Sequence, residues 1–249
     1  PALPLGANGQ AFEILSLKFD GTNCTTNFND KSVNLVVNAK PTLESVNFAP
    51  VCEGSEGTII LKGLVPFSTG KATYTFAGQT IVGPSGTADV NGEFSISTGI
   101  LPASANNQFF EITKLEIDGT NCSTSFTGKK VKLVVNSKPT LASVTANEVC
   151  FGNATTIVLS GLIPNSTGVA TYTIGGGAPQ TGTSGTASGT TFNIDAGILP
   201  LSADGLDFKI TKLSIDETGC VALFDDKFVT LGVNPLPTIE ISGTPVVCS

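Results

Sequence analysis

Two extended, largely apolar runs meet across a proline in the stretch Val131-Lys132-Leu133-Val134-Val135-Asn136-Ser137-Lys138-Pro139-Thr140-Leu141-Ala142-Ser143-Val144. Proline cannot donate to a β-ladder, and it pushes the residue before it into an extended conformation. The same junction recurs at residues 33–46 and 229–242, each 98 residues away. A strand, a short proline-containing bridge and a second strand predict the join between two β-domains placed end to end.

Cysteines mark the period most clearly. Two series run along the chain at a spacing of 98, namely Cys24, Cys122, Cys220 and Cys52, Cys150, Cys248. Repeats of this length are whole domains, because solenoid units measure about 20–50 residues. The register predicts two complete repeats, 39–136 and 137–234. It assigns residues 1–38 to the C-terminal part of a preceding repeat and residues 235–249 to the start of a following one, so we expect a section of a longer array.

The composition is that of an extracellular β-protein. Thr, Val, Ile, Ser and Gly are plentiful, and no window keeps a helical period. A net charge of −7 argues against nucleic acid or an anionic membrane surface as a partner. No apolar run reaches the roughly 20 residues that a membrane helix needs, so no membrane insertion is expected in this segment. Six regularly spaced cysteines indicate an oxidising compartment.

The first complete repeat is predicted to contain about seven strands, which are the dimensions of an immunoglobulin-like sandwich. The predicted strands are Leu43–Phe48, Thr58–Lys62, Lys71–Phe76, Thr87–Val90, Glu93–Ser97, Phe109–Asp118 and Lys130–Asn136. Asn91-Gly92 is expected to turn a two-residue hairpin, because both central positions of such a turn need positive φ. The predicted fold class is all-β, with tandem immunoglobulin-like β-sandwich repeats.

The long strand near the end of the repeat changes face once. Phe110 and Ile112 lie on one face by alternation, and the apolar set then moves to Leu115 and Ile117. Alternation with a one-residue slip is typical of a β-bulge. We therefore predict a bulge near Thr113-Lys114.

Two disulfide pairings are compatible with the sequence. Pairing within a repeat gives Cys52–Cys122 and Cys150–Cys220, each closing a 70-residue loop, which the chain-entropy model values at about 4 kcal/mol. An end-to-end array argues for the alternative, Cys52–Cys220 across the junction. There each repeat enters at one end and leaves at the other, so its two cysteines lie at opposite ends. Cys24, Cys122, Cys150 and Cys248 then pair outside this sequence or remain unpaired.

No catalytic residue or cofactor is predicted. The chain has no histidine, which excludes Ser-His and Cys-His nucleophiles and histidine metal sites. Asp118 and Asn121 are weak candidates for calcium, because Ca²⁺ prefers carboxylate and carbonyl oxygens. They lack the dense acidic spacing of a dedicated calcium loop, so a plain Asp/Gly turn is the preferred interpretation.

Two further features have a structural and a functional interpretation. Tyr74 and Tyr172 recur at one position and are expected to pack in the core or at the junction rather than to stack on sugars. Four asparagines stand in the N-glycosylation triplet, which arises readily by chance in an Asn/Thr-rich chain. They are Asn23, Asn121, Asn153 and Asn165.

Several short motifs resemble the tandem extracellular repeats of SprB-like giant gliding-motility adhesins of Bacteroidota. They are Pro41-Thr42, Val51-Cys52-Glu53-Gly54, Gly119-Thr120-Asn121-Cys122, Leu133-Val134-Val135-Asn136, Val233-Asn234-Pro235-Leu236-Pro237-Thr238 and Val246-Val247-Cys248. The resemblance implies a type IX-secreted protein on the cell surface, associated with the outer membrane. It also implies a protein that the gliding machinery carries and that attaches to a substratum. The family has no catalytic residues that would map onto this chain.

Two functions of different classes follow. In the first, the repeats are a structural stalk that gives an adhesin filament its length. In the second, each repeat binds glycan and contacts surface polysaccharide. A glycan binder needs the same polar and aromatic groups on the exposed loops of each repeat. The loop at residues 77–85 differs from the loop at residues 175–183, whereas the turns, the junctions and the cysteines recur. The sequence therefore favours the stalk, with neighbouring repeats, and possible polysaccharide or gliding machinery, as partners, and it does not favour an enzyme.

Overall fold

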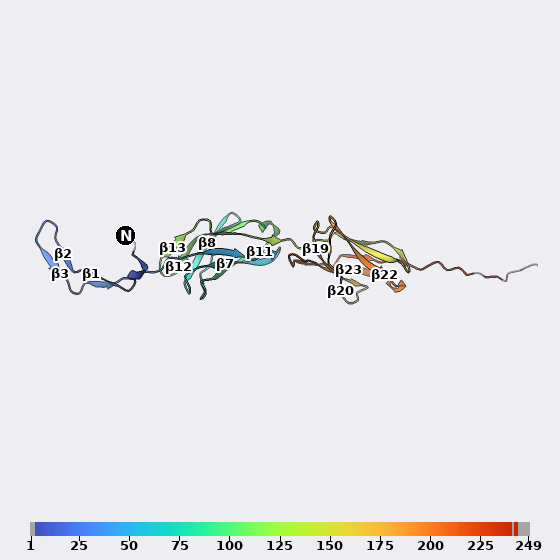
Figure 1. Ribbon diagram of the computed structural model, residues 1–249, viewed down its shortest axis with the longest axis horizontal. Helices are drawn as coiled ribbons and strands as arrows, with labels where there is room; N and C mark the ends of the chain where they lie inside the picture. Colours follow the sequence, from blue (N-terminus) through green and yellow to red (C-terminus); the bar gives the residue numbers. More distant parts are fainter. Residues whose placement is uncertain (1–2, 241, 244–249) are drawn as a thin grey trace, which may run out of the picture. The chain divides into compact units, whose positions relative to one another are not determined.

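The computed structural model describes residues 3–240, 242 and 243, and it divides into two compact units, Pro1–Val135 and Asn136–Ser249. The division falls one residue from the predicted repeat boundary between residues 136 and 137. The regular structure of the described residues is β-strand (Figure 1). The exceptions are three single turns of 3₁₀-helix, η1 (Leu5–Ala7), η2 (Ala103–Ala105) and η3 (Leu201–Ala203). In the described part no helix has the length and apolar character needed to cross a membrane.

The first complete repeat is built from two antiparallel sheets. Its strands are β5 (Ser45–Phe48), β6 (Val51–Cys52), β7 (Ser55–Lys62), β8 (Thr69–Phe76), β9 (Gln79–Val82), β10 (Gly86–Thr87), β11 (Phe94–Leu101), β12 (Phe109–Ile117), β13 (Cys122–Ser125), β14 (Lys130–Lys132) and β15 (Val135–Asn136). One sheet has the order β10-β8-β12-β13, with β14 also on β12 and β9 also on β8. The other has the order β11-β7-β5. These two layers form a sandwich, and β6 and β15 make up a separate two-stranded sheet.

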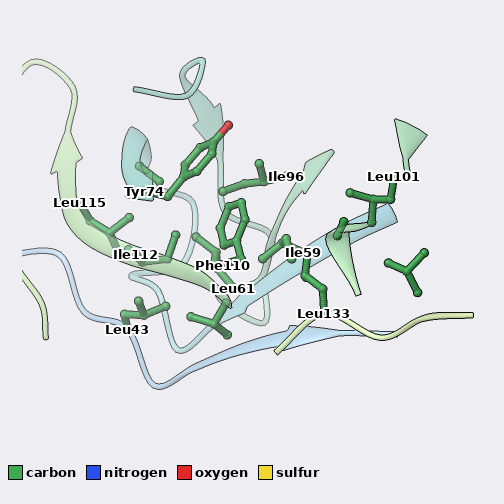
Figure 2. Packing of buried hydrophobic residues seen from close by; sticks show 14 residues of the cluster. Leu43, Ile59, Leu61, Tyr74, Ile96, Leu101, Phe110, Ile112, Leu115 and Leu133 are labelled. Atoms are coloured by element: carbon green, nitrogen blue, oxygen red, sulfur yellow. The ribbon is translucent and has the colours of Figure 1, made fainter. Parts of the chain in front are cut away.

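The facing apolar sides of the two sheets form the core of this repeat. Ile59 and Leu61 of β7 and Ile112 of β12 are fully buried, as alternation along each strand requires. Phe110 is 1 % exposed, and the ring of Tyr74 stacks on it at 4.5 Å between centroids (Figure 2). The prediction that Tyr74 packs in the core is confirmed.

The second repeat has the same plan. Its strands are β16 (Ser143–Ala146), β17 (Val149–Cys150), β18 (Ala154–Ser160), β19 (Thr167–Ile174), β20 (Gln180–Thr181), β21 (Gly185–Thr186), β22 (Thr191–Ile198), β23 (Asp207–Ile215), β24 (Val221–Leu223), β25 (Phe228–Thr230) and β26 (Val233–Asn234). The sheet orders are β20-β19-β23-β24 and β16-β18-β22. Tyr172 stacks on Phe208 at 4.5 Å, which repeats the pair Tyr74–Phe110.

The predicted bulge is present in both repeats. The pairing of β12 with β8 skips one residue between Ile112 and Lys114, which leaves Thr113 as the extra residue. Its hydroxyl donates to the carbonyl oxygen of Thr73 at 3.1 Å. Thr211 makes the same 3.1 Å bond to Thr171. The bulge turns Leu115 back onto the core, where it is 6 % exposed.

Replacing Thr113 by Val should destabilise the first repeat by about 1 kcal/mol, because Thr73 then loses a hydrogen-bond donor at the bulge. Urea unfolding of the variant measures the loss. Thr124→Val is the matched control. The Thr124 hydroxyl is buried and has no hydrogen-bond partner among the described residues, so its removal should be neutral or stabilising. Equal losses in the two variants would contradict this account.

The predicted hairpin at Asn91-Gly92 is wrong. The two segments belong to different sheets, since β10 pairs with β8 and β11 pairs with β7. The turn is organised by Asp89, whose Oδ1 accepts bonds from the backbone N–H groups of Asn91 (2.8 Å) and Glu93 (2.7 Å). An aspartate that bonds the backbone two residues ahead makes a local turn of its own, which the Asn-Gly pattern does not reveal.

The predicted final strand, Lys130–Asn136, is divided in two. Its first part, β14, pairs with β12, and its second part, β15, pairs with β6 in a separate two-stranded sheet. Val51 N donates to Val134 O at 3.1 Å at this crossing. The chain therefore changes sheets shortly before it leaves the repeat.

Residues 3–38 form two small ribbons that belong to the first unit. β1 (Ala11–Glu13) pairs with β4 (Ser32–Asn34), and β2 (Ser16–Lys18) pairs with β3 (Thr25–Asn27). Every residue of these four strands is exposed. The ribbons thus carry apolar side chains in strand register without a core of their own.

Candidate functional site

Each of the two proline-containing junctions makes the same hydrogen bond to the repeat that follows it. Thr42 Oγ1 donates to the carbonyl oxygen of Gly63 at 2.6 Å, and Thr140 Oγ1 donates to that of Gly161 at 2.7 Å. The next residue enters the core, and Leu43 and Leu141 are 7 % and 6 % exposed. Each repeat therefore begins at a fixed point, held by a hydroxyl and an apolar anchor.

In each repeat, a glycine allows the junction to lie close to the loop that follows β7 or β18. Gly63 and Gly161 have φ of +75° and +76°, and a Cβ on either would lie 2.5 Å from Glu44 Cβ or 2.3 Å from Ala142 Cβ. Positive φ and close approach both require glycine at this point. The loop and the residues after the junction are thus in direct contact.

Gly63→Ala is expected to cost about 2–4 kcal/mol, because the left-handed backbone and the collision with Glu44 both act against it. Gly78→Ala separates the two causes. Gly78 has φ of +76°, and a Cβ added there would have nothing within 4 Å, so only the backbone cost of about 1–2 kcal/mol applies. Thermal unfolding of both variants measures the difference, and equal losses would show that the contact with Glu44 is unimportant.

The cysteines are in two states. Cys52 and Cys220 are disulfide-bonded, and Cys24, Cys122 and Cys150 carry free thiols. Cys248 lies outside the described residues. The bonds Cys52–Cys122 and Cys150–Cys220 are therefore not present, because each needs one of the free thiols. The within-repeat pairing differs from the structure on both bonds.

The geometry within one repeat explains this difference. Cys122 opens β13, and its Sγ lies 3.9 Å from the carbonyl oxygen of Asn38, where the chain enters the repeat. Cys52 lies in β6, which runs beside β15, where the chain leaves. The two sulfurs thus belong to opposite ends of the sandwich, and a disulfide needs Cα atoms within about 7 Å.

The second repeat places its cysteines in the same way. Cys220 is fully buried, and its Sγ lies 3.9 Å from the carbonyl oxygen of Asn136. Cys150 is exposed in β17, which pairs in parallel with β26 at the other end of the repeat. A disulfide in an immunoglobulin-like chain is consistent with an extracellular or secreted protein.

A threonine two residues before one cysteine of each repeat was not singled out from the sequence. Thr120 Oγ1 accepts a bond from Cys122 N at 3.1 Å, and Thr218 Oγ1 accepts one from Cys220 N at 3.3 Å. Thr22 makes the same 3.2 Å bond to Cys24. The signal was present, since these threonines recur in step with the cysteines. They fix the backbone that carries each thiol.

The calcium candidates lie in this turn. Asp118 N donates to Thr69 O at 2.9 Å, and Asn121 takes a left-handed conformation with φ of +56°. Thr120 Oγ1 also donates to Ile117 O at 3.0 Å, so the turn is closed by its own groups. No group of three or more His, Cys, Asp or Glu side chains in the described chain is placed to hold a metal ion. Calcium binding by Asp118 and Asn121 stays a prediction.

The four asparagines of the glycosylation triplets are all exposed: Asn23, Asn121, Asn153 and Asn165. Exposure is necessary for modification and does not establish it, so glycosylation of these residues also stays a prediction.

A small apolar cavity recurs at matching positions of the two repeats. Its volume is about 40 Å³ in each. The lining includes Leu61, Phe94 and Leu115 in the first repeat, and Leu159 and Phe192 in the second. A space of this size holds at most a few water molecules, so it has no room for a sugar ring.

The charged groups on its rim do not recur. Lys114 donates to the carboxylate of Glu116, and this bond lowers the pKa of Glu116 below its ordinary value. Ser214 replaces Glu116 in the second repeat, so the pair is absent there. Both side chains are solvent-exposed, where an ion pair contributes little. This pair is therefore not a feature that the two repeats share as a site.

Comparison with solved structures identifies the fold. A marsupial T cell receptor matches with a TM-score of 0.50 at 13 % identity, over 79 % of this chain and 74 % of the receptor chain. The human OSCAR ligand-binding domain matches with a TM-score of 0.28 at 11 % identity, over 74 % of this chain and 94 % of that domain. No protein-family model and no curated protein matches the sequence. At this identity the likeness establishes the fold alone: the chain is an all-β protein of immunoglobulin-like sandwich domains.

Proposed function

We propose that the chain is a structural stalk segment of a long cell-surface adhesin filament. One observation carries the proposal: the two repeats share the features that begin and end a repeat, whereas their loops at residues 77–85 and 175–183 differ. The shared features are the Thr-anchored junction, its glycine-dependent loop and the threonine-supported cysteines. A protein selected for length needs identical joins, and it tolerates differences in the loops between them.

We further propose that Cys52 and Cys220 are bonded to each other across the junction. Both are disulfide-bonded, whereas Cys24, Cys122 and Cys150 are free. If the same pairing continues at the 98-residue period, the partner of each free thiol would be a cysteine of a further repeat. A covalent bond at every junction would stiffen a filament against pulling, which suits a stalk.

The resemblance to gliding-motility adhesins gives this stalk its setting. The filament would be exported by the type IX system, stand on the outer membrane and move with the gliding machinery. Electron micrographs of the intact protein test the stalk directly. A thin fibre with a beaded repeat of roughly 40 Å is expected, since strands of about ten residues set the domain length. Repeats folded back side by side would overturn the proposal.

Glycan binding by each repeat is the second candidate. The small apolar cavity that recurs in both repeats counts against it, because the cavity has no room for a sugar ring. A glycan array with the full 249-residue chain distinguishes the two candidates. Specific, saturable binding would establish the binder, and its absence is expected from a stalk.

A further inference from the structure

The ribbons of residues 3–38 expose an apolar face whose counterparts are buried in both complete repeats. Phe12 and Leu17 are 55 % and 63 % exposed. Their counterparts 98 residues later, Phe110 and Leu115, are 1 % and 6 % exposed. The same holds for Ile14, which is 47 % exposed, against 0 % for Ile112. Exposed apolar groups that are contiguous on one face mark an interaction surface.

The strands that carry this face pair in the same register as the corresponding strands of a complete repeat. Phe12 pairs with Val33 in β1–β4, as Phe110 pairs with Val131 in β12–β14. A side-chain bond beside it also recurs. Asn8 Oδ1 accepts from Val37 N at 2.9 Å, and the corresponding bond in the first complete repeat, from Val135 N to the amide oxygen of Asn106, measures 3.1 Å. Residues 3–38 therefore hold the geometry of a half-sandwich before anything covers it.

In the complete repeats this face has an established partner. The sheet β11-β7-β5 covers it in residues 39–136, with Ile59, Leu61 and Ile96 among the buried side chains that meet Phe110 (Figure 2). The second repeat uses the sheet β16-β18-β22 in the same way. The covering sheet comes from the first part of each repeat in both cases.

We infer that the exposed face of residues 3–38 is the acceptor for the first part of a repeat of this same sequence class. The occupant is a segment equivalent to residues 39–98, which contains most of the covering sheet in the first complete repeat. Its two apolar strands lie on Phe12, Ile14 and Leu17 as β7 and β11 lie on their counterparts. This inference concerns how the face is completed, and it holds whether or not the filament is an adhesin.

Fusion of a donor to the full chain tests the inference. A copy of residues 39–98, with Cys52→Ser in the copy to avoid a new disulfide, is joined ahead of Pro1 of the 249-residue chain. We expect amide exchange in β1 and β2 to slow by at least about 100-fold, because both strands then enter a cooperative core. Ile59→Asp in the donor copy alone should abolish the slowing, since Ile59 is fully buried in its own repeat.

A second donor segment controls for the case in which the first donor does not fold in the fusion protein. Residues 137–196 are the equivalent segment of the next repeat and should protect β1 and β2 equally. If neither donor slows exchange in these strands, the inference is wrong. Sedimentation of the unmodified chain tests the rival occupant. A monomer supports an open face, and a dimer that Phe12→Ala dissociates would show that a second copy covers it instead.

Discussion

Phe110→Ala is expected to destabilise the first complete repeat by about 3–5 kcal/mol, which is the range for truncating a buried phenylalanine. The ring is 1 % exposed and lies at the centre of the core, 4.5 Å from Tyr74 and 6.2 Å from Phe76 between ring centroids. Truncation removes buried apolar surface and two aromatic contacts, and it leaves a cavity that the rigid sheets cannot close. Thermal unfolding should show the first repeat melting at least about 10 °C lower.

The chain supplies its own control for this experiment. Phe12 has the same place in the period and the same register neighbour type, but 55 % of its surface is exposed. Phe12→Ala should therefore change stability by no more than about 0.5 kcal/mol. Phe208→Ala, in the fully buried position of the second repeat, should match Phe110→Ala. A large loss from Phe12→Ala would mean that residues 3–38 have a core that exposure does not reveal.

The parts of the fold that the sequence predicted are those governed by alternation. A period of two identifies a strand and its buried face, and a slip in that period identifies a bulge. Thr113 is the clearest case, because the apolar set moves to the other parity after Ile112 and the ladder skips at that point. The immunoglobulin-like class followed from the number and spacing of such strands.

The parts that failed depend on contacts distant in sequence. The division of residues 130–136 between two sheets depends on β6 being available to pair with β15, which alternation cannot reveal. The turn after β10 depends on the carboxylate of Asp89, which outweighs the preference of Asn91-Gly92. Local patterns specify which residues face inward, whereas the partner of each strand is a property of the assembled sandwich.

The cysteines show how topology adds to spacing. The period relates Cys52 to Cys150 and Cys122 to Cys220, but it does not say which members bond. Both pairings were compatible with the sequence, and the free thiols of Cys122 and Cys150 are inconsistent with the within-repeat pairing. The junction threonines Thr42 and Thr140 were visible as part of a motif, yet their hydrogen bonds to Gly63 and Gly161 required the structure.

Reduction is expected to change how far the chain extends under force. If Cys52 and Cys220 are bonded to each other, the disulfide transmits the pulling force directly between them. The about 170 residues that lie between these cysteines then add no length when they unfold in the oxidised protein. Reduction should release roughly 550–600 Å of additional contour length, at about 3.3–3.6 Å per residue. Single-molecule pulling with and without a thiol reductant measures this. Cys122→Ser is the control, because a free thiol contributes nothing to either curve.

The released length identifies the bond, because each alternative hides a different segment. Bonds within the repeats would hide two segments of about 70 residues and release roughly 230–250 Å each. A bond between the repeats instead keeps both sandwiches from extending until it is cut. In the chain-entropy model, this disulfide stabilises the folded state by up to about 5 kcal/mol. Under force it prevents any extension of the segment that it closes for as long as the bond is intact. A filament built from such joins would bear tension covalently through its junctions, so two separate releases of the shorter length would remove the mechanical basis of the proposed stalk.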